Sequence, residues 1–151
     1  MTKIVILIGF FLLSNNLIAF SDIELGLLKK NNGVILYLLN TSLADVYVNK
    51  RFAIGPADGL NEVELVFTNA DGQKFLFMSK VRTSPASEKD YNLLGADMFV
   101  GRYFSLDQLS RYYALVQGEY KVKAIYKDRH LVDKTAFSEK LESKPISITI
   151  E

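Results

Sequence analysis

The sequence predicts an all-β protein that folds as an antiparallel β-sandwich. After residue 22, apolar and polar residues alternate with a period of two along most of the chain, which is the pattern of strands with one buried face. Turn-forming residues separate these stretches at frequent intervals. The stretches number about seven to nine, a strand count typical of two packed antiparallel sheets.

Residues 1–21 have the pattern of a secretory signal peptide. Lys3 precedes an unbroken apolar run of about ten residues, and Ala19 and Ser21 match the small-residue rule for cleavage. An uncleaved anchor is the alternative, but a spanning helix needs about 20 apolar residues. We therefore expect cleavage after Ser21, an exported domain at 22–151 that is periplasmic or secreted, and no membrane insertion after cleavage.

Each predicted strand depends on its own alternation or apolar run. The strands are expected at 23–27, 34–39, 46–48, 62–67, 75–78, 98–104, 120–126 and 146–150, with 131–137 as a further candidate. The run at 34–39 is apolar on both faces, as in a central strand. Alternation places Glu62 and Glu64 on the polar face of their strand. The pair Asp71-Gly72 favours a tight hairpin, and the irregular stretch 82–97 is predicted to be a surface loop.

One stretch departs from the strand pattern and predicts a short helix or helical turn. Ser105 and Gln108 form a capping-box sequence, with Ser105 as the N-cap residue. Apolar residues then recur at helical spacing, at Leu106, Leu109 and Tyr112 or Tyr113.

A glycine turn at Gly118 enters a strand that begins with Tyr120, which is typical of a tyrosine corner. The Tyr120 hydroxyl would then bond back to the preceding loop and close one end of the sandwich. An ordinary buried tyrosine is the alternative.

Composition excludes several classes of function. The 18 basic and 17 acidic residues give a formal net charge of +1, whereas nucleic-acid proteins concentrate positive charge. The chain has no cysteine, which excludes disulfides, thiolate metal sites and a cysteine nucleophile. It has one histidine and no phosphate-binding glycine loop or G-x-S-x-G elbow. We therefore expect no enzyme activity, no catalytic residues, no cofactor and no metal.

His130, with Asp128 and Asp133, is the nearest approach to a metal site. One imidazole and two carboxylates are too few well-spaced ligands, and the sequence D-R-H-L-V-D favours a hairpin connection instead. Asp58-Gly59, with Asn61 and Glu62, distantly resembles a calcium loop. It lacks the regular carboxylate spacing of an EF-hand, so a turn is the preferred interpretation.

Aromatic residues are denser near the predicted helix than elsewhere, at Phe99, Tyr103, Phe104, Tyr112 and Tyr113. They could form a binding surface, because aromatic side chains are favoured at interfaces. Packing between the helix and the sheets is the alternative and the preferred interpretation. Lys121 and Lys123 alternate with apolar residues and are expected on a solvated strand face rather than at an anion site.

Several short motifs, in this order, resemble a known module. They are Asn40-Thr41-Ser42 with Val46-Tyr47-Val48, Asp71-Gly72, the run from Lys80 to Pro85 with Asp90-Tyr91, then Leu106, Leu109, Tyr112 or Tyr113, and the run from Gly118 to Val122. The series is similar to the immunoglobulin-like, non-catalytic N-terminal domain of deuterolysin-type (aspzincin) zinc metallopeptidases, which include lysine-specific endopeptidases. The likeness covers most of residues 23–150.

The resemblance implies an immunoglobulin-like antiparallel β-sandwich and an exported setting. In that family, peptidase activity belongs to a downstream domain with an H-E-x-x-H motif, and these 151 residues contain no such motif. No catalytic residue therefore carries over, and we expect the module to stand alone without the catalytic domain. The leading hypothesis is an exported, non-catalytic binding module that contacts another protein. The alternatives are an inhibitor or folding partner of a separately encoded exported peptidase, and a small hydrolase with an unrecognised site.

Overall fold

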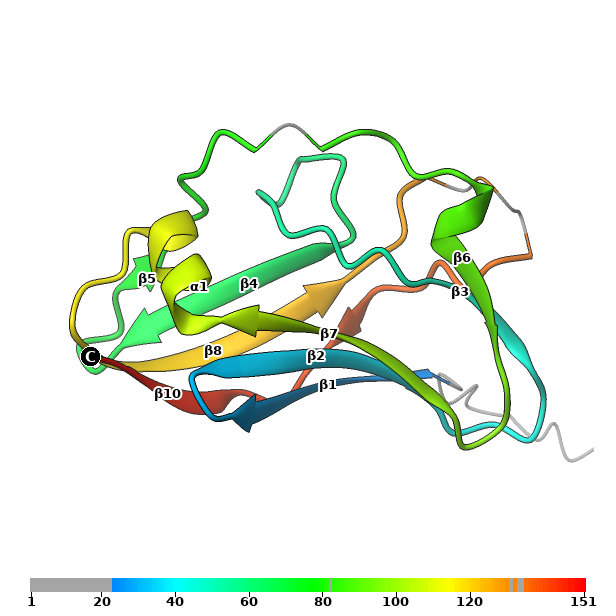
Figure 1. Ribbon diagram of the computed structural model, residues 1–151, viewed down its shortest axis with the longest axis horizontal. Coiled ribbons are helices and arrows are strands. Elements are labelled where there is room, and N and C mark those ends of the chain that lie inside the picture. The colour runs from blue at the N-terminus through cyan, green and yellow to red at the C-terminus, as the bar shows by residue number, and fades with distance from the viewer. Residues whose placement is uncertain (1–22, 82, 131, 133–134) are drawn as a thin grey trace, which may run out of the picture.

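Two antiparallel sheets pack face to face across the core of the protein (Figure 1). The computed structural model describes residues 23–81, 83–130, 132 and 135–151. One sheet has the order β1 (Ile23–Lys30), β2 (Gly33–Asn40), β7 (Phe99–Ser105). The other has the order β10 (Ile146–Ile150), β8 (Gly118–Tyr126), β4 (Val63–Asn69), β5 (Lys74–Phe75), with β9 (Leu141–Glu142) also beside β8. A separate pair, β3 (Val46–Asn49) and β6 (Tyr91–Leu94), lies at one end.

The core lies between the sheets and follows from the period-two alternation of the strands. The inward residues of β2, β4 and β8 are almost completely buried: Val34, Leu36, Leu38, Val63, Leu65, Phe67, Val122, Ala124 and Tyr126. Burying each large side chain of this set contributes about 1.5–3 kcal/mol relative to exposure. As predicted, β2 is a central strand, because it pairs with β1 on one side and β7 on the other.

The strand order is that of an immunoglobulin-like sandwich, so the predicted fold class is confirmed. In such a sandwich, strands A, B, E and D form one sheet and strands C, F and G form the other. Here β1, β2 and β7 take the places of A, B and E, while β4, β8 and β10 take those of C, F and G. In the described part of the chain, no strand takes the place of D, beside β7. The chain between β5 and β6 instead crosses above that side of the sandwich (Figure 1).

The predicted helix is present as α1 (Leu106–Tyr113), between β7 and β8. Ser105 is its N-cap, and its side chain accepts a hydrogen bond from Gln108 N at 3.1 Å. Leu106, Leu109 and Tyr113 form the buried face. The second half of the predicted capping box is wrong: the cap of α1 has no return bond from Ser105 N to the Gln108 side chain, whose Nε2 donates to the Tyr112 hydroxyl at 2.9 Å.

The tyrosine corner is confirmed. Tyr120, near the start of β8, donates its hydroxyl hydrogen to the Val116 carbonyl at 2.9 Å. Gly118 makes this turn with a φ of 153°, which favours glycine. The bond closes the connection from α1 into β8.

The predicted hairpin is confirmed at Asn69, whose carbonyl accepts from Gly72 N at 3.0 Å. Gly72 has a φ of 80°, as this turn requires. The strand expected at 75–78 is shorter than predicted, because the chain leaves the sheet after Phe75 and Met78 N bonds to the Tyr112 carbonyl at 2.8 Å.

The loop predicted at 82–97 is wrong in part. It contains a 3₁₀ turn, η1 (Glu88–Asp90), and strand β6, whose pairing with β3 is a long-range contact. Strand β9 was not predicted either. The candidate strand at 131–137 lies partly outside the described residues, and its described residues, 132 and 135–137, are not in a strand.

The expected signal peptide, residues 1–21, also lies outside the described residues. Neither described helix is long and apolar enough to cross a lipid bilayer.

Candidate functional site

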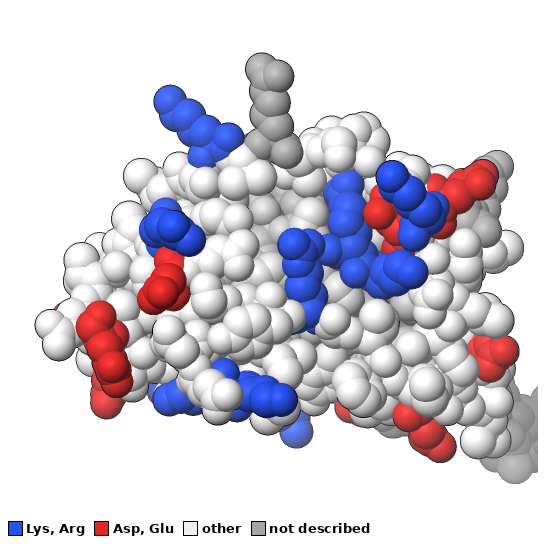
Figure 2. All heavy atoms as spheres, viewed as in Figure 1, with Lys and Arg blue, Asp and Glu red and all other residues white. Residues whose placement is uncertain are grey.

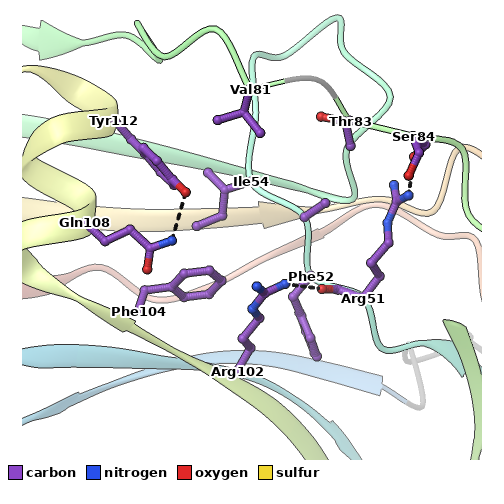
Figure 3. A pocket seen from close by; sticks show the side chains of 11 residues that line it. Arg51, Phe52, Ile54, Val81, Thr83, Ser84, Arg102, Phe104, Gln108 and Tyr112 are labelled. Carbon is purple, nitrogen blue, oxygen red and sulfur yellow. Dashed lines mark hydrogen bonds between the residues drawn. The ribbon is translucent and has the colours of Figure 1, made fainter.

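A trough of about 250 Å³ lies along the side of the sandwich where strand D would be (Figure 3). Its walls come from β7, α1, the chain after β3 and the chain after β5. The lining residues are Arg51, Phe52, Ala53, Ile54, Val81, Thr83, Ser84, Arg102, Phe104, Gln108 and Tyr112. Because Arg102 and Phe104 belong to β7, the free edge of that strand borders the trough.

The edge of β7 offers unpaired backbone groups to the trough side. At the two ends of the β2–β7 ladder, Asn40 N donates to Met98 O and Leu106 N donates to Asn32 O, each at 2.9 Å. Bonding alternates along an antiparallel pair, so Phe99, Gly101 and Tyr103 direct their N–H and C=O groups away from β2. In the described residues, these groups have no hydrogen-bond partner. The edge can therefore accept one more strand.

Arg102 is the charged group at the centre of this edge. Its Nη1 donates to the Arg51 carbonyl at 3.0 Å, and its guanidinium carbon lies 5.4 Å from the centre of the Phe104 ring. It has no acidic partner among the described residues. Basic side chains occupy the middle of this face and also part of its lower border, and most acidic side chains lie toward its left and right ends (Figure 2).

The floor of the trough is apolar and is held in a strained conformation. Phe52 is completely buried, and its φ of 48° is uncommon for an aromatic residue. Such a conformation costs about 1–3 kcal/mol and persists only when its surroundings fix it. The residues on both sides are fixed by one carboxylate, because Glu62 accepts from the Arg51 side chain and from Ala53 N at 2.9 Å. Glu62 therefore positions the floor.

Glu62 accepts four hydrogen bonds in a site where its side chain is fully buried. Its Oε2 accepts from Arg51 Nε at 3.1 Å and from Ala53 N. Its Oε1 accepts from Arg51 Nη2 at 2.6 Å and from Asn49 Nδ2 at 3.3 Å, and His130 Nε2 lies 3.0 Å from the same oxygen. A buried carboxylate is tolerated only when it is paired and bonded in this way.

The network continues from Asn49 to a second carboxylate, Asp128. Asn49 Nδ2 lies 3.3 Å from Asp128 Oδ1, and the Tyr91 hydroxyl donates to Asp128 Oδ2 at 2.6 Å. Burial raises the pKa of Tyr91, and the bond to Asp128 raises this pKa further, so the phenol stays protonated and donates. The end of β3, the start of β6 and the chain after β8 are thus joined through one polar cluster.

Both ring nitrogens of His130 are used within this network. Its Nδ1 accepts from Ala86 N at 3.3 Å, and its Nε2 lies 2.9 Å from Arg51 Nη2 and 3.0 Å from Glu62 Oε1. Neither nitrogen is left for a metal ion.

The two weak metal candidates of the sequence meet in this cluster, because Glu62 comes from one and Asp128 and His130 from the other. Asp133 lies outside the described residues. No group of three or more acidic or histidine side chains is arranged to hold a metal ion within the part of the chain that the structure describes. The segment with Asp58 is a turn, as preferred, with Gly59 N bonded to the Pro56 carbonyl at 3.0 Å.

The prediction for Glu62 is wrong: it was expected on a polar strand face, and it is only 2% exposed. The alternation failed because Glu62 precedes β4, where the chain from Asn49 to Ala53 covers it.

Of the five aromatic residues near the helix, some pack in the core and others are exposed, so each of the two interpretations holds for part of the group. Phe104 and Tyr113 are core residues, and Tyr112 lines the trough. Phe99 and Tyr103 are 67% and 50% exposed, on the outer face of the β1–β2–β7 sheet.

That outer face is apolar around Tyr37, whose ring lies 6.3 Å from the Phe99 ring in an edge contact. A Cβ at Gly26 would lie 2.1 Å from the Tyr37 ring, so glycine makes room for this tyrosine.

On the opposite sheet, Lys121 is exposed, and Lys123 pairs with Glu142. Lys140 also lies 2.8 Å from Glu142. The hydrogen bond from Lys123, reinforced by Lys140, lowers the pKa of Glu142 to about 2.

Sequence reasoning did not single out Arg102, Arg51 or Asn49. A signal existed for Arg102, because it is a charge in the middle of an otherwise apolar strand. None existed for Arg51 and Asn49, whose partners are remote in the sequence.

No known family model matches the chain, and no curated protein matches it. The functional assignment therefore depends on the geometry of the trough and the edge.

Proposed function

We propose that this protein is an exported, non-catalytic, immunoglobulin-like binding module that receives an extended segment of a partner protein beside β7, in the place of strand D. The observation that carries the proposal is the unpaired edge of β7, which borders a trough. The resemblance to the N-terminal domain of aspzincin peptidases supports both the immunoglobulin-like fold and the exported location in this proposal.

Strand addition suits this edge for two reasons. The free N–H and C=O groups of Phe99, Gly101 and Tyr103 supply main-chain hydrogen bonds, which give affinity irrespective of sequence. Alternate side chains of an added strand would face opposite ways, toward the trough floor or toward the exposed rings of Phe99 and Tyr103. An inserted segment would thus continue the sheet and cover apolar surface.

Peptide selection combined with amide hydrogen exchange tests this proposal. Random peptides of about ten residues, the upper end of ordinary strand length, are displayed and selected on the protein. We expect a selected peptide to slow exchange at the amides of Phe99, Gly101 and Tyr103. The amides of Val100 and Arg102 should change little, because they face β2. Uniform protection, or protection elsewhere, contradicts strand addition.

Two substitutions at one position provide a matched control. Tyr103→Pro removes the outward N–H group and should abolish peptide binding, while Tyr103→Phe keeps that group and should preserve it. Equal binding by both variants would show that the peptide does not pair with the edge.

A further inference from the structure

We propose further that the segment received beside β7 carries a carboxylate, and that Arg102 binds it. This inference rests on the proposed function, because it assigns a chemical preference to the same trough. It follows from the charges in the lining, the geometry of Arg102 and the size of the cavity.

The charge of the lining is unbalanced. Among the described residues, two arginines line the trough and no acidic residue does. Arg51 is compensated, because it forms two hydrogen bonds with the buried carboxylate of Glu62. Arg102 has no such partner in the described residues, so it carries the positive charge that a ligand would meet.

The guanidinium of Arg102 is oriented and only partly used. The bond to the Arg51 carbonyl and the contact with the Phe104 ring hold its plane in place. A guanidinium has five N–H donors, and one of them is committed to that carbonyl. The remaining donors can form a two-pronged pair with a carboxylate, which is the planar anion that best matches this group.

The cavity limits the ligand to about one side chain. About 250 Å³ is below the usual range of roughly 300–1,000 Å³ for small-molecule sites. The buried residues Phe52 and Ile54 also line the trough, which suits an apolar stem. An acidic side chain on the inserted strand fits this arrangement, as does the carboxylate at the end of a peptide.

The experiment compares displayed-peptide selections on the wild-type protein, on Arg102→Gln and on Lys121→Gln. Lys121 is exposed on β8 of the opposite sheet, so Lys121→Gln removes the same charge away from the trough. We expect the wild-type protein and Lys121→Gln to enrich apolar peptides with one Asp or Glu, or with a free carboxyl end. Arg102→Gln should enrich apolar peptides without this preference.

Individual peptides then distinguish the two sources of the carboxylate. One arm replaces the acidic residue by its amide, and the other amidates the peptide end. We expect one of these changes to weaken binding to the wild-type protein about 10- to 100-fold and to have no effect on Arg102→Gln, since hydrogen bonds to charged groups have this strength. Arg102→Lys keeps the positive charge but removes the planar pair of N–H donors, so it should lose part of the binding affinity for the carboxylate peptide.

The outcomes separate the inference from the proposed function. Selection of apolar peptides with edge protection, but without a carboxylate preference, would overturn the inference and leave strand addition intact. A carboxylate preference that persists in Arg102→Gln would also overturn it. If none of the three proteins selects any peptide, the proposed function itself is overturned.

Discussion

Replacing the carboxylate of Glu62 by an amide is the most informative perturbation of this fold. Glu62→Gln keeps the shape of the side chain but leaves one oxygen where the carboxylate has two. Four N–H donors converge on the carboxylate, two at Oε1 and two at Oε2, and His130 Nε2 lies 3.0 Å from Oε1. At best, the amide oxygen takes the place of Oε1, so the amide nitrogen then faces Arg51 Nε and Ala53 N.

The expected cost can be worked out from those two donors. Each buried donor left without an acceptor costs about 1–3 kcal/mol. Breaking one partner of a buried ion pair costs about 3–5 kcal/mol in total, which agrees with two such donors. Because Ala53 N would lose its acceptor, the left-handed conformation of Phe52 would also lose support. We therefore expect a loss of about 3–5 kcal/mol in the free energy of unfolding.

Urea unfolding measures this loss. With a slope of about 2 kcal/mol per molar urea, the midpoint should fall by about 1.5–2.5 M at an unchanged slope. Glu64→Gln, two residues further along the chain, is the control and should change stability by less than about 0.5 kcal/mol. If the two variants unfold at the same midpoint, Glu62 does not stabilise the fold through its charge.

Four further predictions concern separate features. Tyr120→Phe removes only the hydroxyl that bonds to the preceding loop, so the unfolding free energy should fall by about 0.5–1.5 kcal/mol; equal denaturant midpoints would contradict this. The pKa of Glu142 is lowered from 4.5 to about 2, so its stabilising effect should be complete above pH 4.5 and be lost as the pH falls toward 2; carboxyl-carbon NMR should show a higher pKa for Glu142 in Lys123→Met, still below its ordinary value because Lys140 remains, and an unchanged pKa would contradict this pairing. Intact-mass analysis of the exported protein should show a chain that begins at Asp22, and retention of Met1 would refute cleavage. The exported protein should bind no stoichiometric zinc and should not digest casein; chelator-sensitive proteolysis that disappears in His130→Ala would refute the non-catalytic proposal.

The elements that the sequence predicted correctly depend on local patterns. Alternation identified β1, β4, β8 and β10, because each strand has one face on the core. The cap at Ser105 and the corner at Tyr120 were predictable because their bonds join residues three and four positions apart.

The elements that were missed depend on distant partners. Strand β6 has no alternation, because its ends are buried and its middle is exposed, and only its pairing with β3 makes it a strand. Glu62 is buried by Arg51, 11 residues away, while Asn49 reaches Asp128 across 79 residues. The open position beside β7 is a property of sheet order, which no local pattern contains.

The open edge of β7 also affects how copies of this protein behave toward one another. An unpaired edge beside exposed rings is a template for aggregation, because a second copy of β7 could dock on it. Two copies of Phe99–Ser105 paired antiparallel in full register would place Arg102 directly opposite Arg102. Like charges at that position repel, so this arginine acts as a gatekeeper of the edge. We therefore expect concentrated solutions of the protein to aggregate when the charge of Arg102 is removed or neutralised.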